Sequence, residues 1–551
     1  MKYHVPSEVM WDVVDHVNDR PTLSRICVSS KELQKYATPR LYSHMVLHVG
    51  SFSEFIYMQM CINRGARTQM ERFTQHLTFK DAQPQKRSNQ NFNKEESWLG
   101  STRCTSYDIG LLITAILEII KPGRLLTFRF LSRRDLKEDV FRHLLLQQKN
   151  IQHLEVPTRD AYPIIRSSLS EGRIPCFFPA LRVIDLSFRS TRLFSAFIKR
   201  LVFKPSTADH NIQCLRISVD RSIQEFSAIF CQELERERSR RPTQLSGVRM
   251  LSLSGFNLHS LFPAARDIFK VHSLVSIVLW NCSGAAEFLL QIGREYRNTK
   301  IALKQLAAVI EMERNTKDAA LQGVYRICHL TSLHLSWKGE HDDGPETTIR
   351  HMPVLATSLR SLTLYNDSDL QSSDLVEYQT PFLRSWEGCN KLRQLAVQVK
   401  DSLMDISNWR TSVDTWRELR HLPALSLLHL HNTSRKTEDE LLIFVDRLFL
   451  MLSHHHFCPQ LRAVVIDSTG NSRNRFNKFR HCFIKSSDAF VDIHPTIYAR
   501  SVSTISLREV VPESDILDLD SVYHWPGGGA PGQFHSYPDG GRRFPFDSSS
   551  Y

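Results

Sequence analysis

The stretch Leu274-Val275-Ser276-Ile277-Val278-Leu279 decides the fold, because its spacing of aliphatic residues returns along most of the chain. The repeated feature is an aliphatic residue at the first, fourth and sixth positions, here Leu274, Ile277 and Leu279. The last two of these, Ile277 and Leu279, are two positions apart, so in a strand both side chains would point to the same face. A period of two is typical of a strand with one buried face. Each copy of the unit therefore predicts one short β-strand.

Copies of the unit are regularly spaced, as their middle aliphatic residues show. Successive middle residues are 26 to 36 apart, except for one step of 333 − 277 = 56, which fits two units. We interpret 301–314, inside this long step, as a helix, because its aliphatic residues would share one helical face. Weaker copies occur at Leu77, Phe128 and Leu154. The measured series of middle residues runs Leu154, Ile184, Leu215, Leu251, Ile277, Leu333, Leu362, Leu395, Leu428 and Val464.

Segments between these strands have helical patterns, notably 194–201, 223–235, 285–292 and 440–452. One short strand cannot bury an aliphatic row alone, whereas stacked units can bury their rows against one another. The pattern therefore predicts an α/β leucine-rich-repeat solenoid with parallel strands on its concave face and helices on its convex face. A doubly wound α/β sheet is the alternative, although no Gly-x-Gly-x-x-Gly follows an early strand.

The texture of the sequence divides the chain into three regions. Residues 1–48 have the pattern of a small three-helix module. Residues 49–511 form the repeat region, with insertions expected near 81–107 and 293–329. Residues 512–551 are rich in Gly, Pro and Ser and are predicted to be a disordered tail.

Composition narrows the function classes. The 551 residues carry a formal net charge of +12, but the basic residues are scattered, so nucleic-acid binding is not favoured. The 11 cysteines contain no Cys-x-x-Cys pair, which favours a reducing compartment, cytoplasmic or nuclear. The best apolar run, 111–120, is too short for a membrane span and contains Glu118. No membrane association is expected.

The N-terminal module begins with a helix pattern. Val9, Val13 and Val14 share one helical face, and Pro6 stands just ahead as a start signal. A second apolar patch follows at 23–28, and Ser30 can open a third helix, which we expect to end at Pro39. A unit of this size needs a partner or an adjoining domain to cover its apolar faces.

This module resembles the F-box family, in particular the F-box proteins abundant in filamentous fungi. The family opens with Leu-Pro-x-Glu and aliphatic residues, where this chain has Val5-Pro6-Ser7-Glu8-Val9-Met10. Valine thus replaces the usual leucine, and Ser29 and Leu33 also depart from the family pattern. The later elements of the family pattern follow in order and without a gap, as Val13-Val14, Leu23, Ile26, Val28, Ser30-Lys31, Ala37-Thr38-Pro39 and Leu41-Tyr42.

The resemblance, which covers about 40 residues, implies a function. F-box helices dock on a Skp-type adaptor, which bridges to a cullin, so the chain would be the substrate-recognition subunit of a Skp–cullin–F-box ubiquitin ligase. The alternative is a repeat scaffold or regulatory module without a ligase role, in which these residues only cap the repeats. The residues implied as adaptor contacts are Val5, Pro6, Val9, Met10, Val13, Leu23 and Ile26.

A target protein is expected to bind the concave face, to which the residues between the buried aliphatics would point. Trp280 and Tyr365 each follow directly after the last aliphatic of a unit and are the favoured contacts, since aromatic residues dominate interface hot spots. The expected target-binding residues are Arg216, Trp280, His334, Tyr365, His429 and His431, with Ser252 on the same face.

Motifs for catalysis or cofactor binding are absent from the sequence. It contains no phosphate-binding loop, no His-Glu-x-x-His and no Gly-x-Ser-x-Gly, so we expect no enzyme activity and no cofactor. The run 454–456 of three histidines, with Cys458 and His481-Cys482, lacks the paired spacing of a zinc site and reads better as a solvated helix end. A basic aromatic stretch at 473–480 is only a weak nucleic-acid signal.

Overall fold

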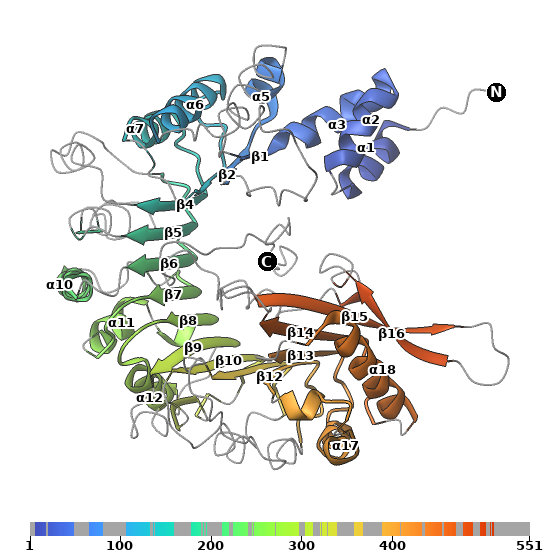
Figure 1. Cartoon of the computed structure of the whole chain (residues 1–551). Helices are drawn as coiled ribbons and strands as arrows, with labels where there is room; N and C mark the ends of the chain where they lie inside the picture. The colour runs from blue at the N-terminus through green and yellow to red at the C-terminus, as the bar shows by residue number, and fades with distance from the viewer. Residues whose placement is uncertain are drawn as a thin grey trace, which may run out of the picture. The chain divides into compact units, whose positions relative to one another are not determined.

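The chain divides into two compact units, Met1–Val248 and Arg249–Tyr551, here called the N-terminal and the C-terminal unit. Each is described by itself, from a computed structural model (Figure 1). With short interior gaps, the structure describes residues 6–48, 66–80, 106–158, 178–195, 212–219, 224–240, 245–296, 303–311, 320–338, 357–366, 388–431, 436–469, 478–488 and 496–511. The expected insertion at 81–107 lies almost wholly, and the expected tail at 512–551 wholly, outside these residues.

The N-terminal unit opens with three helices, α1 (Ser7–His16), α2 (Arg20–Ser29) and α3 (Lys31–Ser43). Pro6 directly precedes α1, and the Ser30 hydroxyl accepts a hydrogen bond from the Leu33 amide at 3.1 Å, which caps α3. Three short helices were therefore correctly predicted from the sequence. The next residues, at 44–48, already form the first strand.

One boundary prediction was wrong, because α3 continues through Pro39 to Ser43. Proline removes one intrahelical hydrogen bond and usually ends a helix. Here the turn after Pro39 is held by tertiary contacts: Leu41 packs against the core of the three helices, and Arg40 pairs with Asp15 of α1. These contacts offset the lost backbone hydrogen bond.

Six strands of the N-terminal unit lie side by side in the order of the chain, and each pair from β1 to β6 is parallel. The weak copies at Leu77 and Phe128 form strands as regular as the clear ones, with Leu77 opposite Phe128. The strands are β1 (His44–His48), β2 (His76–Lys80), β3 (Thr127–Leu131), β4 (His153–Thr158), β5 (Val183–Phe188) and β6 (Cys214–Val219). Among the described residues of this region, the helices are α5 (Arg67–Phe73), α6 (Ser106–Ile119), α7 (Glu138–Gln147) and α10 (Glu225–Arg240).

The C-terminal unit has the same arrangement within itself. Its strands also follow the chain order and are parallel as far as β14, after which β15 and β16 pair antiparallel. The strands are β7 (Met250–Ser254), β8 (Ser276–Trp280), β9 (Gln305–Glu311), β10 (Ser332–Lys338), β11 (Ser361–Asn366), β12 (Gln394–Gln398), β13 (Leu427–His431), β14 (Ala463–Thr469), β15 (Lys478–Asp488) and β16 (Thr496–Val502).

Helices alternate with several of these strands, and α11 and α12 lie on one side of β7 to β9 (Figure 1). Three of the helical patterns in the sequence correspond to α10, α12 and α18, whereas the one at 194–201 falls largely outside the described residues. The expected α/β class is therefore confirmed. The helices are α11 (Phe262–Phe269), α12 (Ala285–Tyr296), α17 (Trp409–Arg417) and α18 (Glu438–His454), with 3-10 turns η4 (Val271–Ser273), η5 (Asp401–Met404) and η6 (Glu418–His421).

The helix expected at 301–314 is wrong, because residues 305–311 of this segment form strand β9. Its register places Leu306 opposite Ile277 on one side and Leu333 on the other, so the long step does contain two units. The aliphatic residues of 305–311 fit a period of two as well as a helical period. Strands β8 and β10 offer backbone hydrogen bonds on both sides, which a helix there would leave without partners.

The aliphatic residues of the repeated unit form the core, as predicted. Leu333, Leu362, Leu395, Leu428 and Val464 are all fully buried and lie opposite one another in register on β10 to β14. Helices α12 and α18 supply further buried aliphatic and aromatic side chains.

The opposite face of the same strands is also buried, which the sequence did not predict. Thr363, Ala396 and Val465 are at most 1% exposed, and Ala396 and Val465 join a second apolar cluster that includes Leu507 and Val511. The Val511 amide donates a hydrogen bond to the Leu507 carbonyl at 2.9 Å, so these two residues form a helical turn. The turn packs against the sheet face expected to be open.

Candidate functional site

The three N-terminal helices present apolar side chains to solvent. Val9 and Val13, one helical turn apart on α1, are 48% and 58% exposed, and Val28 at the end of α2 is 83% exposed. Trp11 is 46% exposed, with its ring edge against Tyr36 at a centroid distance of 5.3 Å. Trp11 and Val28 were not among the residues predicted to contact an adaptor.

The remaining predicted adaptor contacts lie at different depths. Pro6 is exposed and Met10 is half-buried, whereas Val5 lies outside the described residues. Leu23 is only 4% exposed and forms the core of the three helices with Val14 and Ala37, against which Ile26 packs. Leu23 can therefore present little surface to a partner and mainly holds the helices together.

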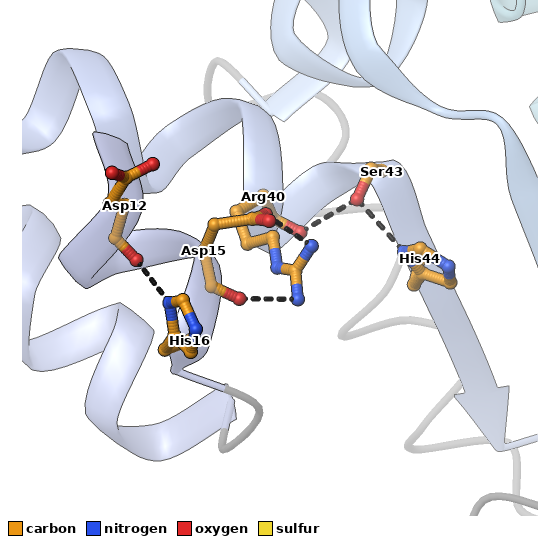
Figure 2. A network of polar contacts seen from close by, with 6 residues as sticks. All are labelled: Asp12, Asp15, His16, Arg40, Ser43 and His44. Carbon is orange, nitrogen blue, oxygen red and sulfur yellow. Dashed lines mark hydrogen bonds and ion pairs between the residues drawn. The ribbon is translucent and has the colours of Figure 1, made fainter. Parts of the chain in front are cut away.

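A polar clamp fixes the end of α1 against α3 (Figure 2). Arg40 donates one hydrogen bond to the Asp15 carboxylate at 2.6 Å and another to the Asp15 backbone carbonyl at 2.9 Å. The second satisfies a carbonyl in the last turn of α1 that has no partner within the helix. Ser43 donates to the Arg40 carbonyl at 2.9 Å, which extends the clamp towards β1.

The sheet face opposite the aliphatic rows carries a row of charges in the N-terminal unit. Arg129, Glu155, Asp185 and Arg216 lie opposite one another in register on β3 to β6. Arg129 pairs with Glu155 at 2.5 Å and Arg216 with Asp185 at 3.5 Å, and all four side chains are at most 22% exposed. The predicted target contact Arg216 therefore lies on the expected face, as part of a nearly neutral row.

Two residues earlier on the strands, the same face carries histidines. His44 stacks on His76 at a ring-centroid distance of 4.0 Å, and His76 shares a hydrogen bond of 2.9 Å with Thr127. Burial, with the neighbouring His44 and His153, lowers the pKa of His76 to about 4. Burial also lowers the pKa of His153 to about 4, although Glu155 opposes this.

These pKa values predict a loss of stability in acid. Unfolded histidine titrates near 6.5, so the folded state binds these protons more weakly than the unfolded chain does. The stabilising contribution of the two uncharged rings is fully present above pH 6.5 and is lost as the pH falls towards 4. The loss is about 2 kcal/mol for each ring, which is less than the difference in pKa alone would give, because both rings keep some solvent contact. Urea unfolding at pH 7.5 and pH 5.0 should show a smaller difference for His76→Gln/His153→Gln than for the unmodified chain.

His16 offers a matched control for this measurement. It is exposed at the end of α1 and contacts only the Asp12 carbonyl of its own helix among the interactions drawn in Figure 2. His16→Gln should keep the pH dependence of the unmodified chain. An unchanged pH dependence in the double variant would mean that other groups cause the acid sensitivity.

In the C-terminal unit, the predicted target contacts lie on the sheet face opposite the aliphatic rows. Those whose side chains are described are buried. His334 and His429 are at most 1% exposed and His431 is 9% exposed. Trp280 is 8% exposed, so little of its side chain is available to a partner protein. Tyr365 lies on β11 opposite Ser336, and its side chain is outside the described residues.

The structure brings two of these residues together with a third that the sequence reading missed. The rings of His429 and His431 are 4.1 Å apart by centroid, and Asp467 of β14 lies opposite His431 in register. Asp467 directly follows Ile466, the last aliphatic of its unit, just as Trp280 follows Leu279. The positional rule that selected Trp280 and Tyr365 could therefore have selected Asp467 as well.

Cys458, which lies close to the three histidines in the sequence, is part of the protein interior. The Cys458 thiol is buried and donates to the Leu419 carbonyl at 2.9 Å, and burial raises its pKa to about 12. Such a thiol stays protonated, which makes it a poor metal ligand. Within the described ranges, every helix is too short or too polar to cross a bilayer.

No protein-family model matches the chain, and no curated protein is similar to it in sequence.

Proposed function

We propose that the chain is an F-box protein with a leucine-rich-repeat solenoid, acting as the substrate-recognition subunit of a Skp–cullin–F-box ubiquitin ligase. Its first helices would dock on a Skp-type adaptor, and its repeat strands would receive a target protein. The compartment would be cytoplasmic or nuclear.

The observation that carries the proposal is the exposed apolar surface of α1. Val9 and Val13 stand one turn apart and about half exposed, in the helix whose sequence resembles the docking helix of the family. Exposed valines on a small three-helix unit are unfavourable in water, and an adaptor would cover them. The clamp between Arg40 and Asp15 supports the same view, because it holds α1 in place without using those side chains.

The repeat region supports the second half of the proposal. Parallel strands in chain order, each with a buried aliphatic row, are the arrangement that a leucine-rich-repeat solenoid would have. In such a receptor the protein performs no bond chemistry. It raises the effective concentration of a target near a ubiquitin-loaded enzyme.

The double variant Pro6→Ala/Val9→Asp tests the adaptor interface. In the uncomplexed chain Val9 is half exposed, so a carboxylate there remains hydrated and the helices fold. In the complex the same carboxylate would be buried without a partner, which costs several kcal/mol. We expect adaptor affinity to fall at least about 100-fold, which corresponds to about 2.7 kcal/mol. Calorimetric titration with a purified Skp-type adaptor measures this, with circular dichroism as a check of folding.

Thr68→Asp is the matched control, because it also adds one carboxylate at an exposed position, but on α5 outside the three helices. It should bind the adaptor like the unmodified chain. Undiminished binding by the folded double variant, or no binding by the unmodified chain, would contradict the ligase role. A repeat scaffold without an adaptor would then be the better description.

A further inference from the structure

A cluster of three metal-ligating side chains lies on strands β13 and β14. His429 and His431 are two residues apart on one strand, so their side chains point to the same face. Asp467 lies on the neighbouring strand, directly opposite His431. One ligand atom from each of the three residues lies within 4.8 Å of the other two.

The distances fit coordination of one ion. His429 Nε2 is 3.0 Å and His431 Nδ1 is 3.2 Å from the same carboxylate oxygen, Asp467 Oδ2. Ligands bound at 2.0–2.1 Å around a zinc ion are separated by about 3.3 Å in a tetrahedron. The same distances fit two hydrogen bonds to one carboxylate, so the geometry allows both arrangements and the choice depends on charge and donor chemistry.

Burial makes the charge of this cluster decisive. The side chain of His429 is fully buried, and those of His431 and Asp467 are 11% and 9% exposed. A carboxylate removed from water to this degree is costly unless a positive charge neutralises it. A divalent ion held by the three residues supplies such a charge at the point where they meet, at neutral pH, where an ordinary imidazole is mostly uncharged. Arg480 lies opposite Asp467 in register on β15, so metal uptake has to be measured directly.

The set of ligand atoms selects the class of ion. Calcium and magnesium prefer oxygen ligands alone, and copper(I) prefers sulfur, whereas two imidazole nitrogens and one carboxylate oxygen suit zinc and its divalent neighbours. Three protein ligands leave a fourth position for water or another small donor.

We propose that His429, His431 and Asp467 bind one divalent transition-metal ion of the zinc class. The site joins β13 to β14 and stabilises the C-terminal unit. It does not depend on the proposed ligase role, since none of its ligands lies in the N-terminal helices.

The experiment uses the full chain and Zn²⁺ or Co²⁺ alone. After chelator treatment and dialysis, one equivalent of Zn²⁺ should bind and raise the thermal midpoint of unfolding. Co²⁺ should give the visible absorption bands of a site with nitrogen and oxygen ligands. Asp467→Asn, which is nearly isosteric, and His431→Gln should each weaken Zn²⁺ binding by at least about tenfold.

His421→Gln is the matched control. His421 also lies in the C-terminal unit and pairs with a carboxylate, Glu418 at 3.4 Å, but outside the cluster of three. This variant should bind Zn²⁺ and Co²⁺ like the unmodified chain. If the unmodified chain takes up neither ion, or if folded Asp467→Asn and His431→Gln bind as tightly as the control, the cluster is a hydrogen-bonded triad and the proposal is wrong.

Discussion

Replacing Leu507 by alanine is expected to lower the free energy of unfolding of the chain by about 2–5 kcal/mol. Leu507 is fully buried in the cluster that also contains Ala396, Leu427 and Val465. The substitution would remove apolar contacts on the sheet face and leave a cavity beneath the turn at 507–511. A loss of this size is a large share of the stability of an ordinary domain.

Two truncations separate this turn from the residues after it. A chain that ends at Ser506 should lose at least as much stability as Leu507→Ala, because it uncovers the whole cluster. A chain that ends at Val511 keeps Leu507 and Val511, and removal of the Gly- and Pro-rich residues 512–551 is expected to change the thermal midpoint little.

Leu450→Ala is the matched point variant, since Leu450 is 57% exposed on α18 of the same unit. It should change stability by no more than about 0.5 kcal/mol. Thermal and urea unfolding of these four variants and of the unmodified chain measure these differences. Equal stability of Leu507→Ala and Leu450→Ala would show that the turn contributes nothing to the fold.

The sequence predicted the strands well, because their pattern is local. Each unit carries its own aliphatic spacing, and even the weak copies at Leu77 and Phe128 form strands in register with one another. The three N-terminal helices could be predicted equally well, since Pro6 and Ser30 mark two of the helix starts. Local chemistry was sufficient in these places.

Predictions from the sequence were wrong or incomplete where contacts between distant segments determine the structure. The period of β9 was ambiguous by itself, and only its neighbours β8 and β10 select the strand. The buried second face depends on residues 507–511, more than 40 positions after Val464. Polar residues there, such as His429, were read as a binding surface because nothing local shows what covers them. Asp467 fits the local positional rule that selected Trp280, but its place opposite His431 depends on strand register, which the sequence does not show.

Gly293→Ala is expected to destabilise the chain by about 1–3 kcal/mol, contrary to what helix propensity alone predicts. Gly293 lies in α12, and in an uncrowded helix alanine is more favourable than glycine by about 0.8–1.0 kcal/mol. A Cβ atom on Gly293, however, would meet the backbone carbonyl and Cα of Gly323. A Cβ atom on Gly323 would in turn meet the backbone of Leu289 and Leu290. Backbone cannot rotate away as a side chain can, so the two segments would have to separate.

The sign of the stability change therefore decides between crowding and propensity. Urea unfolding of Gly293→Ala and Gly323→Ala should show a loss for both, and the double variant should lose less than their sum, because one separation of the segments relieves both contacts. Arg294→Ala, exposed on the same helix, is the control and should change stability by less than about 0.5 kcal/mol. A gain in stability for Gly293→Ala would mean that α12 and the helical segment at Gly323 are not in backbone contact. Gly293 precedes β9 in the chain and Gly323 follows it, so the close backbone approach joins the two segments that flank this strand in the sequence.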